Sequence, residues 1–244
     1  MIEVNGVSKI FEDSAQETKA LDEVSFSCCA GEIFGLLGPN GAGKTTCLRI
    51  LSTVLCPTAG EAKVANYNVV DNPQEVRRRI GFISGNTGIY DRLTPHETVL
   101  YFGKLYGLSK SFLKKRCDEI YEMFQMTDFI HTLNGKLSTG MKQKVSIART
   151  IVHDPPVLIF DEPTANLDIL VAKNVLNFIL DCREKGKCII LSTHIMSEAQ
   201  KLCDRLGIIH KGKLLVQGKT EDLCAQYDCG DIEDIFFSLI DSGF

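Results

Sequence analysis

Apolar residues form two kinds of pattern along most of this chain. Short continuous runs predict buried strands, and recurrence every three or four positions predicts amphipathic helices. The predicted strands span 33–37, 80–83, 157–160 and 188–191. The predicted helices between them span 47–54, 73–79, 141–152 and 168–184. Strands that alternate with helices favour an α/β fold, in which a mostly parallel sheet is flanked by helices.

The N-terminal region has a different and more polar pattern. Residues 2–7 and 24–28 alternate apolar and polar side chains, which predicts two short strands. The polar stretch 12–19 between them predicts a loop or a hairpin tip. We therefore expect an antiparallel β subdomain at the N-terminus.

A helical segment interrupts the alternation of strands and helices. Thr94 and Glu97 form the signature of a capping box around Pro95, so a helix is expected to begin there. Further helical patterns follow, and we expect an α-helical subdomain over approximately residues 90–150. Residues 210–244 predict a short C-terminal hairpin and helices. Because the chain shows no linker rich in Gly, Pro or Ser, residues 1–244 are expected to form a single domain.

Composition narrows the classes of function. The formal net charge of −4 gives no support for binding nucleic acid through bulk charge, so no nucleic-acid partner is expected. The ten cysteines lie mostly in apolar periodic segments without a Cys-x-x-Cys pair, which favours reduced, buried thiols over disulfides. Neither a signal-peptide pattern nor an apolar run of about 18 residues is visible, so a membrane role would need a separate membrane chain.

The glycine-rich stretch after the first buried strand carries the most specific motif. It reads G-x-x-x-x-G-K-T between a predicted strand and a predicted helix, the context of a phosphate-binding loop. Lys44 can reach the β- and γ-phosphates of a nucleotide, and the Thr45 hydroxyl can bind Mg²⁺. The alternative is a glycine-rich turn with a chance lysine. The residues expected to bind ATP here are Gly38, Pro39, Asn40, Gly41, Ala42, Gly43, Lys44, Thr45 and Thr46.

Two more predicted strands end in residues suited to nucleotide hydrolysis. Asp161 and Glu162 directly follow the run 157–160, and His194 follows the run 188–191. We expect Asp161 to hold Mg²⁺, Glu162 to activate the attacking water and His194 to reach the γ-phosphate. The alternatives are an acidic turn that caps a helix and a structural histidine. The carboxyl ends of parallel strands meet at one edge, which favours a shared site.

These motifs, in their order along the chain, resemble the ATP-binding subunits of ABC transporters over essentially the whole length. The resemblance rests on the phosphate loop, Leu137-Ser-Thr-Gly-Met-Lys-Gln-Lys144, Phe160-Asp-Glu-Pro163, Ala165-Asn-Leu-Asp168 and His194. It implies a P-loop NTPase that hydrolyses ATP with Mg²⁺. It also implies a location at the cytoplasmic face of the membrane, beside an integral-membrane permease.

The same resemblance implies further roles for single residues. Phe11 would stack on adenine, although its sequence context alone favours a place in the core. Ser138 and Gly140 would contact the ATP held by a partner subunit, and Asp168 would contact that partner directly. In this resemblance the stretch 137–144 is the family signature, which contacts the ATP of a partner subunit. Because each chain has only one phosphate loop and one signature, the resemblance implies a homodimer or a heterodimer of ATPase subunits.

The sequence also departs from the family pattern. Thr139 and Met141 replace the usual glycine and glutamine of the signature. Gly85 and Asn86 occupy the place of a glutamine that couples hydrolysis to the membrane subunit, so either Asn86 replaces it or coupling runs differently. The stretch 84–94 and the closing segment 232–236 resemble sodium-extruding members of the ABC-2-type exporters.

Two competing functions remain at this point. A non-transport ABC-type ATPase could act on DNA or ribosomes, but the stretch from Lys44 to Ser138 is too short for long coiled-coil arms. A P-loop kinase would leave the stretch 137–144 without a purpose. An ATPase subunit that powers export, with sodium as one candidate cargo, accounts for more of the residues.

Overall fold

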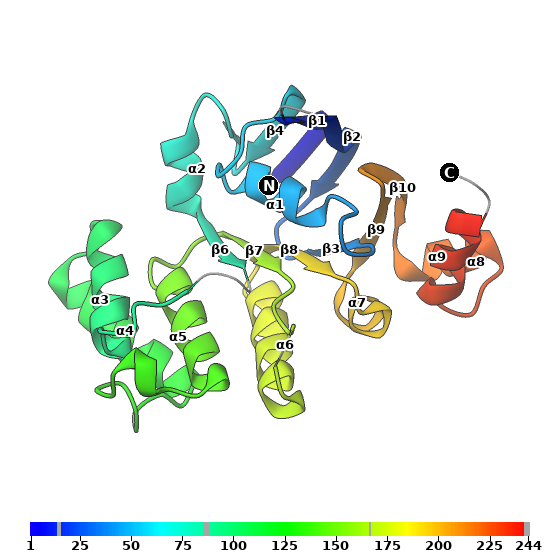
Figure 1. The fold of residues 1–244 in the computed structure, drawn as a ribbon. Helices are drawn as coiled ribbons and strands as arrows, with labels where there is room; N and C mark the ends of the chain where they lie inside the picture. Colours follow the sequence, from blue (N-terminus) through cyan, green and yellow to red (C-terminus); the bar gives the residue numbers. More distant parts are fainter. Residues whose placement is uncertain (14–15, 85–87, 166, 242–244) are drawn as a thin grey trace.

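The structure, a computed structural model, describes residues 1–13, 16–84, 88–165 and 167–241 (Figure 1). Its strands are β1 (Ile2–Asp13), β2 (Gln16–Cys28), β3 (Ile33–Leu37), β4 (Ala59–Val64), β5 (Tyr67–Asn68), β6 (Ile80–Ser84), β7 (Val157–Asp161), β8 (Cys188–Thr193), β9 (Arg205–His210) and β10 (Lys213–Gly218). Its helices are α1 (Lys44–Leu51), α2 (Pro73–Arg79), α3 (Pro95–Leu105), α4 (Lys110–Met123), α5 (Thr139–Ile151), α6 (Ile169–Glu184), α7 (Met196–Leu202), α8 (Thr220–Tyr227) and α9 (Ile232–Asp241), with a 3-10 turn, η1 (Asn134–Lys136).

The larger sheet has the strand order β10-β9-β3-β8-β7-β6. Its strands β3, β6, β7, β8 and β9 run parallel, and β10 returns antiparallel to β9. The central strands are buried along their whole length, which explains why they read as continuous apolar runs. The predicted mostly parallel sheet is confirmed, and the carboxyl ends of β3, β7 and β8 lie at the same edge.

Two apolar cores cover the two faces of this sheet. Alternate strand residues such as Phe34 and Ile190 face α1 and the small antiparallel sheet, whereas Leu37 and Leu191 face the core that contains α5 and α6. Figure 1 shows α1 between the two sheets and α6 on the opposite side of the large sheet. The predicted flanking of the sheet by helices is therefore confirmed.

The N-terminal sheet has the order β2-β1-β4-β5, as an antiparallel subdomain predicts. The expected strand lengths were wrong, because β1 extends to Asp13 and β2 begins at Gln16, inside the polar stretch that predicted a loop or a hairpin tip. Pairs such as Glu12 with Glu17 extend the ladder to Asp13 and Gln16. Backbone hydrogen bonds stabilise this end of the β1–β2 ladder, whose side chains are mostly exposed. The sequence there therefore lacks the alternation of apolar and polar residues that predicts a half-buried strand.

The helical segment contains α3, α4, η1 and α5 at one end of the large sheet (Figure 1). The Thr94 side chain accepts from the backbone of Glu97, and the Glu97 side chain accepts from the backbone of Thr94, so the predicted capping box is confirmed. Helix α5 then leads back into β7 and contacts β6. This return path leads to the amino end of β7, opposite the carboxyl edge where Asp161 and Glu162 lie.

All ten cysteines are free thiols, and six of them are buried as predicted, whereas Cys29 and Cys56 are exposed. Burial raises the pKa of Cys47 to about 12 and that of Cys182 to about 11, so both thiols stay neutral at ordinary pH. Across the part of the chain that the structure describes, no helix combines the length and apolar character needed to cross a membrane.

Candidate active site

The glycine-rich loop joins β3 to α1, as the motif predicts. A Cβ atom at Gly38 would lie 2.2 Å from the Ile209 backbone oxygen, so only glycine allows this close approach. Gly43 has a φ of 110°, and a Cβ atom there would lie 2.6 Å from the Ala20 backbone oxygen. The loop encloses an open hollow of about 410 Å³, and Glu162 lies on its wall. Its form suits a phosphate chain at the start of α1.

Lys44 lies inside this loop with 4% of its surface exposed. Its Nζ donates to the Gly38 oxygen at 2.6 Å and to the Pro39 oxygen at 3.1 Å. The same ammonium lies 3.4 Å from Glu162 Oε1. The loop carbonyls therefore hold a positive charge where phosphates are expected, and the nearest carboxylate balances that charge.

The Asp161 carboxylate receives two hydroxyl donors on one oxygen atom. Thr45 Oγ1 donates to Asp161 Oδ1 at 3.1 Å, and Ser192 Oγ donates to the same atom at 2.7 Å. Thr45 and Asp161 thus offer the hard oxygen ligands that Mg²⁺ prefers. Among the described residues, no group of three or more His, Cys, Asp or Glu side chains could hold a metal ion. A Mg²⁺ ion here would therefore need phosphate and water oxygens as its other ligands, which matches the way it binds with nucleotides.

Glu162 adopts a left-handed backbone conformation with a φ of 50°, which is uncommon for a residue other than glycine. Its backbone N–H donates to the Ser192 oxygen and to Ser192 Oγ, both at 3.1 Å. Its Oε1 lies 3.3 Å from His194 Nδ1 and 3.4 Å from Lys44 Nζ. The turn therefore directs the carboxylate toward the phosphate loop.

The expected convergence of three strand ends is present in the structure. Lys44, Asp161, Glu162 and His194 form one connected cluster at the carboxyl edge of β3, β7 and β8. A second open hollow, of about 920 Å³, continues beside this cluster. Its lining includes Asn40, Thr45, Arg49, Ser84, Thr139, Gln143, Asp161 and Glu162. The arrangement has the groups needed to bind phosphate, coordinate Mg²⁺ and accept a proton from water.

Within the stretch 137–144, Thr139 and Gln143 line the second hollow, whereas Ser138 and Gly140 lie outside it. Ser138 caps the start of α5 by accepting from Met141 N at 3.3 Å, and Asp168 caps α6 by accepting from Val171 N at 3.0 Å. A Cβ atom at Gly140 would lie 2.7 Å from Val171 Cγ2, so the first turns of α5 and α6 are in contact. Among the residues that the structure describes, Ser138 and Gly140 line neither of the two hollows above.

Phe11 and the two residues expected to form a coupling loop complete the set of predicted residues. The core position that the sequence context of Phe11 favours is wrong, because 39% of this residue is exposed on β1. Lys9 Nζ lies 5.2 Å from the centroid of the Phe11 ring, and the exposed ring can stack on a ligand. Gly85 and Asn86 lie outside the residues that the structure describes.

Ser192 and Gln143 contribute to the site although the sequence did not single them out. Ser192 is the first polar residue after the apolar run of β8 and lies two positions before His194, a signal that could have identified it. Gln143 Nε2 donates to the Pro163 oxygen at 3.2 Å, which connects α5 to the turn after Glu162.

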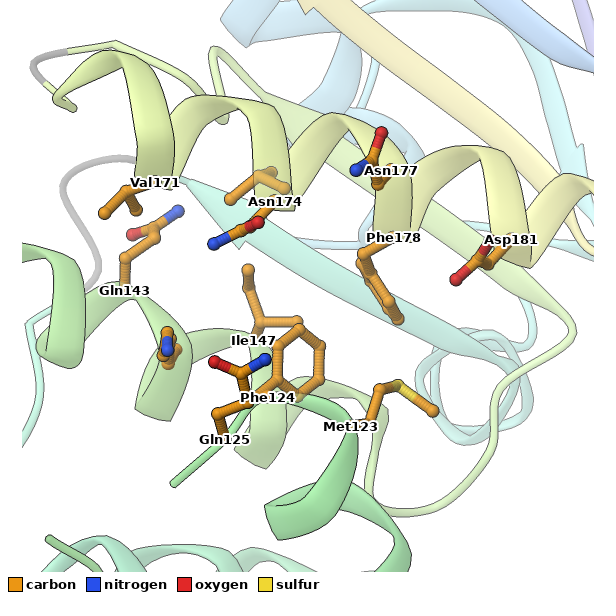
Figure 2. A pocket seen from close by; sticks show the side chains of 12 residues that line it. Met123, Phe124, Gln125, Gln143, Ile147, Val171, Asn174, Asn177, Phe178 and Asp181 are labelled. Carbon is orange, nitrogen blue, oxygen red and sulfur yellow. The ribbon is translucent and has the colours of Figure 1, made fainter. Parts of the chain in front are cut away.

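Another open hollow, of about 680 Å³, lies where the end of α4 meets α5 and α6 (Figure 2). Figure 2 shows the ring of Phe178 pointing from α6 toward the ring of Phe124, and Gln143 at the end near Val171. Gln143 also lines the hollow beside Asp161, so this glutamine separates the two spaces. Lys144 and Asp181 supply the charged groups of this lining, and neither contacts the cluster of Lys44, Asp161, Glu162 and His194 through a hydrogen bond or ion pair within the described residues.

Comparison with known proteins identifies related sequences. A family model described as "ABC transporter" matches residues 21–165. The ABC transporter ATP-binding protein NatA of Bacillus subtilis is 41% identical over 244 residues, covering 100% of this chain and 99% of the relative. The linearmycin resistance ATP-binding protein LnrL of the same species is 34% identical, covering 91% of this chain and 71% of the relative.

Solved structures show the same architecture. A structure described as the ATP binding subunit of an ABC transporter is 30% identical with a TM-score of 0.89, covering 98% of this chain and 99% of the other. A dimeric structure of the ATP-binding cassette MJ0796, in a post-hydrolysis state bound to ADP and Pi, is 27% identical with a TM-score of 0.80. It covers 90% of this chain and 98% of that cassette.

Proposed function

Since the chain belongs to the ABC transporter family of ATP-hydrolysing subunits, we propose that it powers export by a separate integral-membrane permease. The observation that carries the hydrolytic part is the position of Glu162 Oε1, 3.3 Å from His194 Nδ1 and 3.4 Å from Lys44 Nζ. The names of the relatives support the transport part. We place the protein at the cytoplasmic face of the membrane, beside its permease.

Each residue of the cluster has a proposed role in hydrolysis. The loop amides and Lys44 bind the phosphates of ATP, and Phe11 stacks on the adenine ring. Thr45 and Asp161 hold Mg²⁺, which would neutralise charge on the phosphates. Glu162 accepts a proton from the attacking water, and His194 holds the Glu162 carboxylate and the γ-phosphate in a common arrangement. Thr46 and the remaining residues 38–43 form the wall of the loop.

A second copy of this chain completes the proposed site. Ser138 and Gly140 lie on the surface formed by the first turns of α5 and α6, next to Asp168. The next two residues, Ile169 and Leu170, are 86% and 75% exposed, more than any other exposed large apolar residue in the described part of the chain. A large exposed apolar pair beside polar caps is typical of an interaction surface. We propose that a second copy covers it when ATP is bound; the related MJ0796 cassette is described as dimeric, which supports the pairing of two copies.

The cargo is proposed from the sequence of the chain. Residues 84–94 and 232–236 resemble the sodium-extruding branch, so we propose sodium export. The name of the linearmycin resistance relative favours a second candidate, export of an antibiotic. We propose that Gly85 and Asn86 form the coupling loop, with Asn86 in place of the usual glutamine.

The test is to purify the tagged chain from native membranes together with the membrane protein that accompanies it. The complex is reconstituted in sealed vesicles and supplied with ATP. ATP-driven movement of ²²Na⁺, absent with Glu162→Gln, is the expected result. Movement of linearmycin without sodium would select the second candidate. ATPase activity that ribosomes or DNA stimulate, without any accompanying membrane protein, would overturn the transport proposal.

A further inference from the structure

We propose that Ser192 is a positioning residue for hydrolysis, because its hydroxyl connects the expected Mg²⁺ ligand to the expected base. This inference rests on the roles proposed above for Asp161 and Glu162. Ser192 Oγ donates to Asp161 Oδ1 at 2.7 Å and accepts from Glu162 N at 3.1 Å. Ser192 is 0% exposed, so bulk water does not compete for either bond.

The direction of these two bonds follows from their chemistry. An ionised carboxylate only accepts hydrogen bonds, so the single hydroxyl proton of Ser192 points to Asp161. The lone pairs of the oxygen then face the backbone N–H of Glu162. A hydroxyl can serve both neighbours at once, whereas alanine or valine at this position can serve neither.

The register of the sheet makes this contact possible. Strands β7 and β8 are parallel neighbours, and Asp161 is paired with Ser192 in their ladder. The apolar residues of β8 before Ser192 stabilise the strand by burial, and the serine is the first polar side chain opposite the acidic pair. The side chains of β8 therefore change from apolar to polar at Ser192, next to the carboxyl end of β7 where Asp161 lies.

Asp161 is fixed from two sides by this arrangement. Thr45 Oγ1 and Ser192 Oγ both donate to Oδ1, which sets the plane of the carboxylate and hence the direction of its second oxygen. Thr45 belongs to α1, which follows the phosphate loop, whereas Ser192 belongs to the neighbouring strand. Loss of the Ser192 bond would leave Asp161 free to turn about its contact with Thr45.

Glu162 needs support because of its backbone conformation. Its φ of 50° lies in the left-handed region, which side chains other than glycine adopt rarely. Two acceptors of Ser192, the backbone oxygen and Oγ, share the Glu162 N–H at 3.1 Å each. This turn places Glu162 Oε1 near Lys44 and His194. Without the hydroxyl, one of the two acceptors that hold the turn is lost.

The experiment compares Ser192→Ala, Ser192→Thr and Ser192→Cys with Ser52→Ala as a matched control. Ser52 is also buried, but its hydroxyl donates to the Leu48 backbone oxygen at 2.9 Å, at the far end of α1. ATPase turnover is measured over a Mg²⁺ titration. Binding of a fluorescent ATP analogue is measured with Mg²⁺ and with EDTA, and thermal unfolding of the nucleotide-free protein reports the fold.

We expect Ser192→Ala to lower kcat by about 10-fold to 100-fold, the range for loss of a hydrogen bond to a charged group. The Mg²⁺ concentration for half-maximal turnover should rise, because Asp161 is less well positioned. Binding in EDTA should match that of Ser52→Ala, since Lys44 and the loop do not contact Ser192 through a hydrogen bond. Ser192→Thr keeps the hydroxyl and should recover most of the turnover.

Three results would overturn the proposal. Ser192→Ala could hydrolyse ATP like Ser52→Ala with the same Mg²⁺ dependence, or it could lose binding in EDTA as well, as a packing defect would. Should the alanine variant fail to fold, Ser192→Cys keeps the volume with a much weaker donor, and normal turnover in that variant would refute the role. A wild-type protein without ATPase activity would overturn the proposed function itself, a different outcome from normal activity in Ser192→Ala.

Discussion

The exposed apolar pair at the start of α6 allows a quantitative test of the proposed dimer. The double variant Ile169→Ser, Leu170→Ser removes both side chains from the surface next to Asp168. Because these residues are 86% and 75% exposed, they contribute little to the core of one chain. Their replacement should therefore leave the thermal unfolding of the nucleotide-free protein nearly unchanged.

The expected effect on dimerisation follows from the area that a partner could cover. Complete burial of an isoleucine or leucine side chain stabilises by about 1.5–3 kcal/mol. In a symmetric dimer each substitution occurs twice. Coverage of about half the exposed surface of the pair would then contribute about 2–5 kcal/mol, so the double variant should raise the dimer Kd by about 30-fold to 3,000-fold.

The assay is sedimentation velocity with Mg²⁺ and ATP, in a Glu162→Gln background that stops turnover. Leu105→Ser is the matched control, because Leu105 is a 63% exposed leucine on α3, in the helical segment. The control should dimerise like its parent, whereas the double variant should remain monomeric at the same concentrations. Equal dimerisation of the parent, the control and the double variant would refute the proposed contact.

Three further predictions concern the base, the coupling loop and stability. Glu162→Gln should retain ATP binding but lower kcat by about 100-fold or more, the usual effect of a lost general base; normal turnover would contradict this role. Asn86→Ala should lower ATPase turnover of the assembled complex by about tenfold if Asn86 replaces the family glutamine, and unchanged turnover would exclude that replacement. Burial lowers the pKa of His153 to about 4 from the usual 6.5, and its ring stacks on Tyr106. As pH falls, the unfolded chain therefore binds the proton first, and the free energy of unfolding should decrease by about 2 kcal/mol between pH 7.5 and 5. Urea titrations of His153→Gln should show a free energy of unfolding that falls by about 2 kcal/mol less over this pH range. If the variant loses as much stability as the wild type, other groups cause the decrease.

The sequence determined the main elements of the fold and the chemistry of the site. Apolar runs such as Val157–Phe160 identified the buried strands, because parallel strands covered on both faces need apolar side chains at every position. The phosphate loop could be recognised because close approach of the backbone to an anion requires glycine at fixed spacing. The acidic pair and His194 could be placed at one edge because parallel strands share their carboxyl ends.

Other features depended on contacts that a linear pattern does not encode. The polar ends of β1 and β2 pair through backbone hydrogen bonds, which every residue type except proline can donate. The length of these strands therefore could not be predicted from the side chains. The exposure of Ile169 and Leu170 depends on where α6 begins in the fold. The sequence could not show it, because an apolar residue reads the same whether its side chain is buried or exposed. The role of Ser192 depended on the pairing of β7 with β8, because only that register places its hydroxyl opposite Asp161, a residue 31 positions away. Sequence thus determined which groups are present, and tertiary structure decided which of them share a hydrogen bond.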